Sequence, residues 1–215
     1  MINKNTQLFG SFSKKAGSVG CKLFNTSFQF HNINAIYKSF SIDDIRQAIL
    51  SAKCLNFSGF AVSMPFKTEI IKYIDIVDEN VTKTNSCNTV INKNKILYGY
   101  NTDYMAVKDF LIDFKHNTKK KFYILGNGSY SKTVQICCQE LGIDYFLITR
   151  NNWDFIQKIK NSTIFNCTPV ENINYDIETN RFINCINTTE TGYILAKKQA
   201  AIQYKLYTNK TFPLL

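Results

Sequence analysis

The chain has 215 residues, of which 45% are hydrophobic and 20% are charged, and its formal net charge is +10. That length allows one large domain or two small ones with a buried core. No apolar run reaches the roughly 18 residues that a membrane helix needs. No apolar signal core follows the N-terminus, so we expect a cytoplasmic protein.

The basic excess is spread along the whole chain. Only three of the 26 basic residues are arginine, and the single lysine cluster is Lys119-Lys120-Lys121. Nucleic-acid-binding domains usually gather arginines, lysines and stacking aromatics on one stripe. We therefore expect no nucleic-acid partner and no membrane partner, and we interpret the charge as suited to a small anionic ligand.

The seven cysteines predict reduced thiols. Their number is odd, no Cys-x-x-Cys pair occurs, and Cys137 and Cys138 are adjacent within a predicted helix. This pattern is typical of neither a disulfide framework nor a zinc site. We expect buried free thiols and no bound metal.

The first half of the chain alternates strand-like and helix-like segments. Ser18 is predicted to cap the first helix, and Pro65 is placed to open another helix, where its missing N–H costs little. Strands are predicted over 7–10, 35–40 and 57–62, a hairpin over 87–91 and 96–100, and helices over 18–31 and 42–53.

Beyond Asp103 the pattern becomes that of a βαβ unit followed by further short strands. The predicted segments are a helix over 104–114, a linker over 116–118, strands over 121–125, 145–149, 163–167 and 182–186, and helices over 131–141 and 192–206. Alternation of this kind along both halves indicates the α/β fold class.

A Gly126-x-Gly128 turn follows one of these strands and precedes a helix, which is the setting of a dinucleotide site. A tight turn there lets backbone N–H groups and the helix N-terminus face a pyrophosphate. The glycine set is incomplete, because Lys132 or Thr133 stands where a third small residue is expected. An ordinary glycine turn between strand and helix remains the alternative.

Arg150 stands at the end of the next strand. A site for NAD tends to carry Asp or Glu about 20 residues after the glycine turn, whereas an arginine suits the 2′-phosphate of NADP. The residue therefore favours NADP over NAD. A surface arginine without a ligand is the alternative.

Two further segments place reactive side chains after predicted strands. Ser63 and Lys67 follow the strand over 57–62, and Asp103 follows the strand over 96–100. A lysine and an aspartate at such edges can act as a proton-transfer pair. From their spacing alone, ordinary turn residues and a surface ion pair are the preferred interpretation.

Taken together in this order, four segments resemble the shikimate dehydrogenase family, and the resemblance covers nearly the whole chain. The matching motifs are Val62-Ser63-x-Pro65-x-Lys67, Asn88-Thr89-Val90, Gly99-x-Asn101-Thr102-Asp103, and Gln199-Ala200 followed by an aromatic-rich end. Chance agreement of all four in order is improbable.

The resemblance implies an N-terminal α/β substrate domain over 1–102 and a Rossmann-like NADP-binding domain over 103–190, with a cleft between them. The C-terminal segment over 191–215 is expected to pack back on the first domain. A monomer or a homodimer is expected.

The resemblance further implies reduction of 3-dehydroshikimate to shikimate with NADPH, a step of aromatic amino-acid biosynthesis. Lys67 matches the catalytic lysine of the family and Asp103 its partner aspartate. The residues that match substrate ligands are Ser18, Ser63, Asn88 and Gln199. The residues that match the cofactor site are Gly126, Gly128, Ser129, Thr149, Arg150, Asn166, Thr168 and Gly192.

The sequence also departs from the family pattern. Gly20 has no hydroxyl where the substrate loop usually carries a second serine, and Asp154 stands where a second basic residue is usual. The region from Val170 to Glu190 is shorter than in the family, so a trimmed nucleotide domain is expected. These departures leave two alternatives: a dehydrogenase with altered specificity, such as for quinate, and a non-catalytic small-molecule-binding family member.

Overall fold

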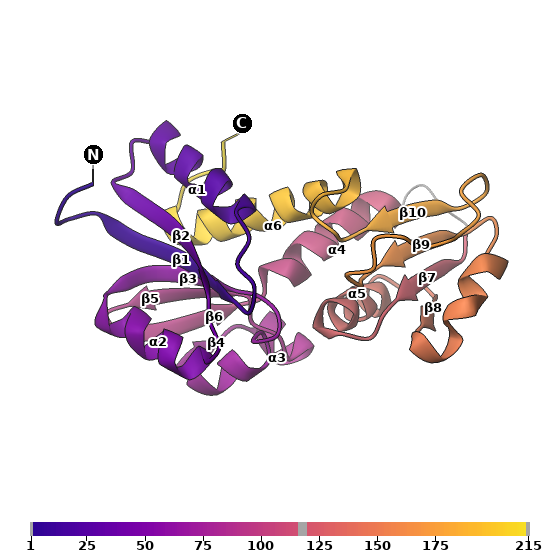
Figure 1. Ribbon diagram of the computed structural model, residues 1–215, viewed down its shortest axis with the longest axis horizontal. Coiled ribbons are helices and arrows are strands. Elements are labelled where there is room, and N and C mark those ends of the chain that lie inside the picture. Colours follow the sequence, from indigo (N-terminus) through magenta and orange to yellow (C-terminus); the bar gives the residue numbers. More distant parts are fainter. Residues whose placement is uncertain (1, 116–119, 214–215) are drawn as a thin grey trace. The chain divides into compact units, whose positions relative to one another are not determined.

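The computed structural model describes residues 2–115 and 120–213 (Figure 1). The linker expected over 116–118 lies outside the described residues. The chain divides into two compact units, Met1–Thr102 with Ala200–Leu215 (unit 1) and Asp103–Gln199 (unit 2). The return to the first unit was expected from residue 191, whereas it begins at Ala200, inside helix α6 (Glu190–Thr208).

Unit 1 is built on a six-stranded sheet in the order β2-β1-β3-β5-β6-β4. The strands β2, β1 and β3 are parallel, β5 and β6 form an antiparallel hairpin, and β4 is parallel to β6. The strand bounds are β1 Gln7–Ser13, β2 Ala35–Ser41, β3 Phe57–Val62, β4 Ile76–Val77, β5 Thr89–Lys93 and β6 Ile96–Tyr100.

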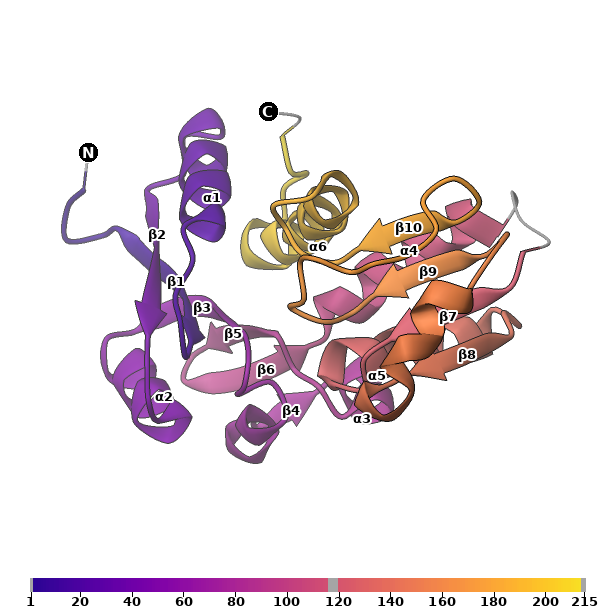
Figure 2. The same cartoon turned by 45° about the vertical axis from the view of Figure 1, so that its right-hand side comes forward.

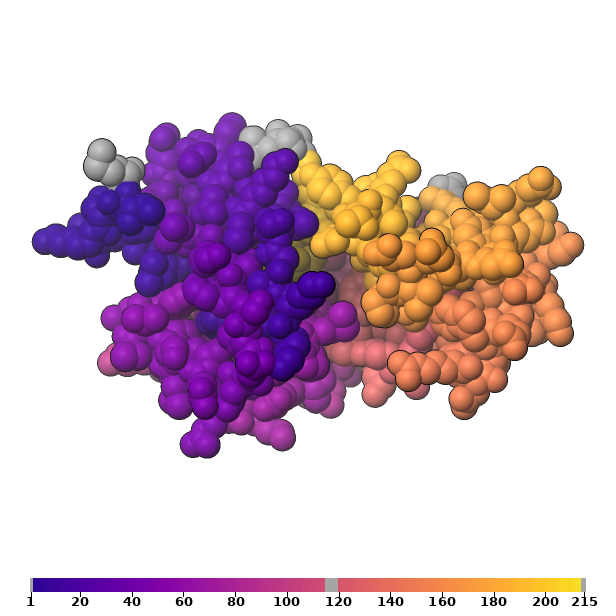
Figure 3. Space-filling view, viewed as in Figure 1, coloured from indigo at the N-terminus to yellow at the C-terminus, as the bar shows by residue number. Residues whose placement is uncertain are grey.

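Helices cover both faces of this sheet (Figures 1 and 2). Because side chains alternate along a strand, Phe9 packs with α1 (Val19–Phe30) and the end of α6, while Phe12 packs with α2 (Ile45–Cys54). The indigo N-terminal segment lies at the surface of unit 1 in Figure 3. The predicted strands and hairpin of this half are confirmed.

Three local predictions for unit 1 need correction. Ser18 precedes α1, but its side chain makes no capping hydrogen bond. The second helix begins at Ile45 instead of residue 42, because the Asp44 side chain accepts from the Gln47 amide and starts the helix there. Pro65 opens a turn, and only a 3-10 helix, η1 (Glu69–Tyr73), follows it.

The Pro65 turn makes a tertiary contact. The Lys67 carbonyl accepts a hydrogen bond from the Cys87 amide, so the turn is joined to the segment that precedes β5. The sequence pattern also missed the short helix α3 (Glu79–Thr84) and the two-residue strand β4. Both are too short to show a periodicity.

Unit 2 contains four parallel strands in the order β10-β9-β7-β8. The chain runs from β7 to β8 on one side and returns to β9 on the other, so the strand order reverses at β7. Ligands of open parallel sheets bind outside the carboxyl ends of the strands at such a reversal. The strand bounds are β7 Phe122–Leu125, β8 Tyr145–Ile148, β9 Thr163–Asn166 and β10 Arg181–Asn184.

The helices of unit 2 are α4 (Thr102–Lys115), α5 (Ser129–Glu140), the 3-10 helix η2 (Arg150–Lys158) and the first half of α6. The connection from β9 to β10, over 167–180, carries neither helix nor strand. Parallel strands are usually joined through a helix, so this part of the sheet is abbreviated, in line with the short sequence there. The α/β fold class is confirmed.

No helix within the described ranges combines the length and the hydropathy needed to cross a bilayer.

Candidate functional site

Three of the predicted residues of unit 1 are gathered where β3 ends. The Ser63 amide donates to the Phe12 carbonyl over 2.9 Å, which keeps Ser63 beside β1. The Val62 amide donates to the Asn88 carbonyl over 2.8 Å. The Cys87 amide donates over 2.8 Å to the carbonyl of Lys67. Main-chain hydrogen bonds therefore bring Ser63, Lys67 and Asn88 to one edge of the sheet.

These three side chains differ in their exposure. Ser63 is exposed, Lys67 is half-buried, and Asn88 is only 4% exposed. A buried polar side chain must satisfy its hydrogen-bonding groups or lose free energy. Asn88 is therefore the residue whose orientation the protein controls most closely.

The oxygen of the Asn88 side chain is held inside the protein. Asn88 Oδ1 accepts from the Thr102 amide over 2.9 Å, from Thr102 Oγ1 over 3.0 Å and from Thr89 Oγ1 over 3.0 Å. A backbone N–H only donates, so the Thr102 amide fixes which end of the carboxamide is the oxygen. Among the described residues, the hydrogen bonds of the Asn88 side chain all use Oδ1, which leaves Nδ2 as a donor for a ligand.

Sequence reasoning missed the buried polar residues behind Asn88. Thr89 Oγ1 lies 2.9 Å from Thr102 Oγ1 and accepts from Gln203 Nε2 over 2.8 Å. All three side chains are at most 2% exposed. One sequence feature points weakly to Gln203. It follows the predicted ligand Gln199 by four residues, so the two residues share one face of a helix.

Ser18 lies in the exposed loop region that follows β1. The Lys14 amide donates to the Met64 carbonyl over 3.2 Å, which ties the start of this loop to the residue after Ser63. Ser18 itself is exposed. A Cβ added to Gly20 would lie 3.2 Å from the ring of Tyr37, so a larger residue at this position would press on that ring.

Asp103 and Gln199, the other two residues predicted for the substrate, belong to unit 2. Asp103 lies in the first turn of α4, where the positive end of the helix dipole favours a carboxylate. Burial raises the pKa of the Tyr130 hydroxyl well above its usual value, and the charge of Asp103 adds to that rise. Asp103 is thus close enough to influence the second residue of α5.

The predicted nucleotide loop joins β7 to α5 with an unusual backbone. Gly126 has a φ of +96°, and an added Cβ would lie 2.6 Å from the Thr168 side chain, so glycine is needed here. Gly128 precedes α5, and nothing lies within 4 Å of a Cβ built on it. Ser131 Oγ donates to the Gly126 carbonyl over 2.6 Å and holds the turn.

The space at Gly128 is open at the N-terminal end of a helix. Ser129 is the first residue of the twelve-residue helix α5, and no side chain caps this helix. The positive end of a helix dipole attracts an anion. The loop therefore combines open space at Gly128 with the N-terminal end of a helix.

Thr149 and Arg150 begin η2. The Thr149 hydroxyl accepts from the Asn151 amide, and the Asn152 side chain accepts from the Thr149 amide over 2.7 Å, which makes a capping box. Arg150 is exposed at the start of the same 3-10 helix. The cap fixes the backbone from which the Arg150 guanidinium extends.

Asn166 and Thr168 hold the loop that follows β9. Asn166 Oδ1 accepts from the Thr168 amide and hydroxyl, over 2.9 and 2.7 Å. Asn166 Nδ2 donates to the Val170 carbonyl and to Asn184 Oδ1, over 3.0 and 3.2 Å. Both ends of this fully buried side chain are thus used within unit 2, which makes Asn166 an organiser of the loop.

Gly192 lies in the first turn of α6 against the end of β10. A Cβ on this residue would lie 1.9 Å from the carbonyl oxygen of Ile186. Thr191 Oγ1 also donates to the Asn184 carbonyl over 3.1 Å. The glycine is required because the backbone after β10 passes against α6.

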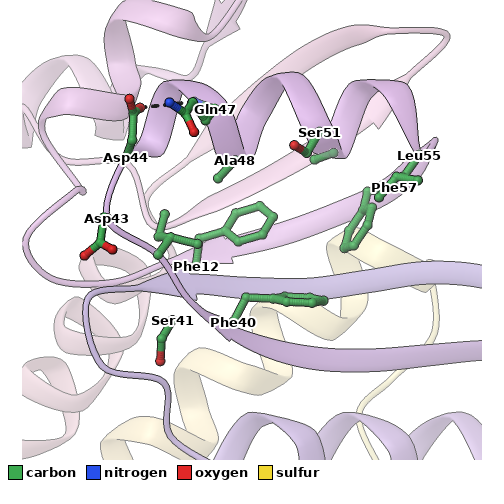
Figure 4. A pocket seen from close by; sticks show the side chains of 12 residues that line it. Phe12, Phe40, Ser41, Asp43, Asp44, Gln47, Ala48, Ser51, Leu55 and Phe57 are labelled. Carbon is green, nitrogen blue, oxygen red and sulfur yellow. Dashed lines mark hydrogen bonds between the residues drawn. The ribbon is translucent and has the colours of Figure 1, made fainter.

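A separate cavity of about 480 Å³ lies between α2 and the sheet of unit 1 (Figure 4). Phe12, Phe40 and Phe57 form much of its wall, and none of the predicted site residues lines it. Of the two carboxylates at its edge, Asp44 caps α2 and Asp43 pairs with Lys14. Within the described part of the chain, no group of three or more His, Cys, Asp or Glu is placed to bind a metal ion.

Comparison with known proteins shows which sequences this chain is similar to. The family model described as shikimate dehydrogenase substrate binding domain matches residues 15–90. A shikimate dehydrogenase-like protein of Haemophilus influenzae is 34% identical over 71% of this chain and 56% of its own length. A shikimate dehydrogenase (NADP(+)) of Saccharolobus solfataricus is 29% identical over 90% of this chain and 71% of its own length.

A solved structure supports the same relationship for the fold. The structure of a shikimate 5-dehydrogenase-like protein superposes with a TM-score of 0.82 at 25% identity, covering 99% of this chain and 95% of that chain. In sequence, the alignment spans little more than half of the first two curated relatives, 56% and 54% of their lengths.

Proposed function

Because the chain belongs to the shikimate dehydrogenase family, we propose that it catalyses the NADP-dependent interconversion of 3-dehydroshikimate and shikimate. The observation that carries this proposal is the fixed carboxamide of Asn88, held with its oxygen inward, in a segment joined by main-chain hydrogen bonds to those of Ser63 and Lys67. A polyhydroxylated ring acid is a ligand that such a row of polar groups can bind.

The substrate is held by hydrogen bonds from side chains. Asn88 Nδ2 donates to a ring hydroxyl oxygen, and the exposed hydroxyl of Ser63 is a second contact. Ser18 is a donor to the carboxylate, and Gln199 is a further ligand for a hydroxyl. A site built to pair with hydroxyl groups rejects analogues that lack them, because its own polar groups would be left unpaired.

Lys67 is the proton-transfer residue. Its ammonium donates a proton to the oxygen of the reacting carbonyl during reduction, and the amine takes the proton back during oxidation. The Asp103 carboxylate accepts a hydrogen bond from the Lys67 ammonium during reduction, and from the reacting hydroxyl of shikimate during oxidation, and so orients the groups that exchange the proton. General acid catalysis of this kind contributes roughly 10²–10⁴-fold to a rate.

The nucleotide loop fits NADP. When bound, the reduced nicotinamide supplies a hydride to the carbonyl carbon. Gly126 supplies the positive-φ turn, Gly128 and Ser129 place the N-terminal end of α5 toward the pyrophosphate, and the guanidinium of Arg150 pairs with the 2′-phosphate. Thr149, Asn166, Thr168 and Gly192 shape the surrounding loops, and the cap and loop hydrogen bonds described above are what support these roles.

The direct test is an assay of the purified chain with shikimate, following the absorbance of the reduced nicotinamide, with NADP and NAD in parallel. We expect turnover with NADP and a lower kcat/KM with NAD. A chain that binds NADPH but never oxidises it with 3-dehydroshikimate is a non-catalytic binder, and the proposal would then be wrong.

One observation favours including quinate in the same assay. Gly20 carries no hydroxyl, and its contact with the Tyr37 ring leaves little room for a larger side chain. One hydrogen bond to the substrate is thus missing from this loop, which relaxes the choice of ring acid. A kcat/KM for quinate that matches or exceeds that for shikimate would identify the chain as a quinate/shikimate dehydrogenase.

A further inference from the structure

We propose that Thr89 is a positioning residue that sets the orientation of the Asn88 carboxamide and thereby the affinity for shikimate. The inference rests on the proposed function, because Asn88 is its substrate ligand. It concerns a residue of the Asn88-Thr89-Val90 motif to which the sequence assigned no role.

Three oxygen atoms form a closed triangle behind the substrate position. Thr89 Oγ1, Thr102 Oγ1 and Asn88 Oδ1 are separated by 2.9, 3.0 and 3.0 Å. All three side chains are buried, with Thr89 and Thr102 fully enclosed. Each oxygen is thus hydrogen-bonded by protein groups. If one of these groups is removed, water does not replace it, and the protein loses free energy of folding.

The protons of this triangle are limited in number. Each hydroxyl has one proton to donate, whereas Asn88 Oδ1 only accepts. Gln203 Nε2 occupies an acceptor site of Thr89 Oγ1 over 2.8 Å. The Thr89 hydroxyl proton therefore points into the triangle, toward Asn88 Oδ1 or Thr102 Oγ1. It stabilises the orientation in which the Asn88 oxygen faces inward.

Thr89 also ties the triangle to two helices. Thr102 is the first residue of α4, and Gln203 lies on the part of α6 that belongs to unit 1. Strand β5, which begins at Thr89, supplies the third element. The Thr89 hydroxyl thus joins β5, α4 and α6. These hydrogen bonds restrict the movement of the adjacent Asn88.

Loss of the hydroxyl leaves two mismatched groups. In Thr89→Val the Gln203 amide has no acceptor, and Asn88 Oδ1 keeps only the Thr102 donors. The carboxamide is then held by Thr102 alone, and the Nδ2 donor is fixed less closely toward the substrate. We expect the KM for shikimate to rise about five- to thirtyfold, with the KM for NADP unchanged.

The test compares Thr89→Val, Thr89→Ser and the control Ser27→Ala in the full chain. Ser27 also has a fully buried hydroxyl in unit 1, which donates to the Leu23 carbonyl instead of to Asn88. Thr89→Ser is expected to restore the wild-type KM for shikimate, and Ser27→Ala is expected to leave it unchanged. If Thr89→Val does not fold, Thr89→Cys replaces it, because a thiol is a weaker donor of similar shape. The expected result is the same: a raised KM for shikimate and an unchanged KM for NADP.

A second measurement does not depend on turnover. In the ¹⁵N-labelled chain, the side-chain NH₂ signals of Asn88 should shift or split in Thr89→Val and return in Thr89→Ser. Unchanged Asn88 signals in Thr89→Val would overturn the inference whether or not the chain is active. Wild-type KM for shikimate in an active, folded Thr89→Val, or equal rises in both KM values, would also overturn it. An inactive wild type with the expected Asn88 signals refutes the proposed function alone.

Discussion

The carbonyl of Lys67 accepts a hydrogen bond from the amide of Cys87 over 2.8 Å. This bond joins the turn after β3 to the residue that precedes Asn88. The main chain of the proposed proton donor is therefore held by a backbone interaction that no change of the Lys67 side chain removes.

Substitution of Lys67 should separate catalysis from folding. We expect Lys67→Ala to lower kcat at least about 10²-fold, because the proton donor is lost, while the circular dichroism spectrum and Tm stay near those of the wild type. The control is Lys72→Ala, which removes an exposed lysine from η1 nearby and should keep full activity. Near wild-type turnover of Lys67→Ala would refute its assignment.

Two glycines of unit 2 should respond oppositely to alanine. Gly192→Ala places a methyl group 1.9 Å from the Ile186 carbonyl oxygen, so we expect a loss of about 3 kcal/mol or more in the free energy of unfolding. Gly128→Ala meets no atom within 4 Å and should leave stability nearly unchanged.

The same pair tests the nucleotide loop. If the open space at Gly128 receives the pyrophosphate, Gly128→Ala raises the KM for NADP without changing the KM for shikimate. Urea denaturation and steady-state kinetics on both variants measure the two effects. A stable Gly192→Ala would contradict the close packing of α6 against the end of β10.

Arg150 should decide between the two nicotinamide cofactors. Loss of a charge-assisted hydrogen bond costs about 1.5–3 kcal/mol, so we expect Arg150→Ala to raise the KM for NADP at least about tenfold and to change the KM for NAD little. Arg46→Ala removes another exposed arginine, from α2 in unit 1, and is the matched control. Equal changes for both cofactors would show that Arg150 does not bind the 2′-phosphate.

The buried thiol of Cys138 should make the protein sensitive to alkali. Burial raises the pKa of this thiol from 9.0 to about 12. Between those values the unfolded chain has released the proton and the folded chain still binds it, so the free energy of unfolding falls as pH rises. Below pH 9 both states are protonated and the group has no effect.

The slope from this one group is about 1.4 kcal/mol per pH unit. Cys138→Ala should therefore show a shallower decline in stability between pH 9 and 11 than the wild type, measured by urea denaturation. Cys54→Ala, which changes an exposed cysteine, should follow the wild-type profile. If the free energy of unfolding of Cys138→Ala falls with pH as steeply as that of the wild type, the Cys138 thiol is not a cause of the alkali sensitivity.

Strand positions could be predicted from the sequence because their pattern is local. The strand over 57–62 and the hairpin around residues 92–95 agree with β3, β5 and β6. The elements that were missed or misplaced depend on partners distant in the chain. Pro65 opens a turn instead of a helix, and the Lys67 carbonyl in that turn bonds to Cys87, twenty residues along the chain.

The sequence by itself determined the family, the α/β class and the identity of the candidate residues. Motifs and glycine turns consist of residues close together in the chain, so the sequence shows them directly. Only the tertiary structure decided how Asn88 is oriented. Its oxygen is fixed by Thr102, fourteen residues away, and by Thr89, which in turn is held by Gln203, 114 residues away. Burial makes these distant hydrogen bonds obligatory, and no local pattern records which buried polar groups will meet.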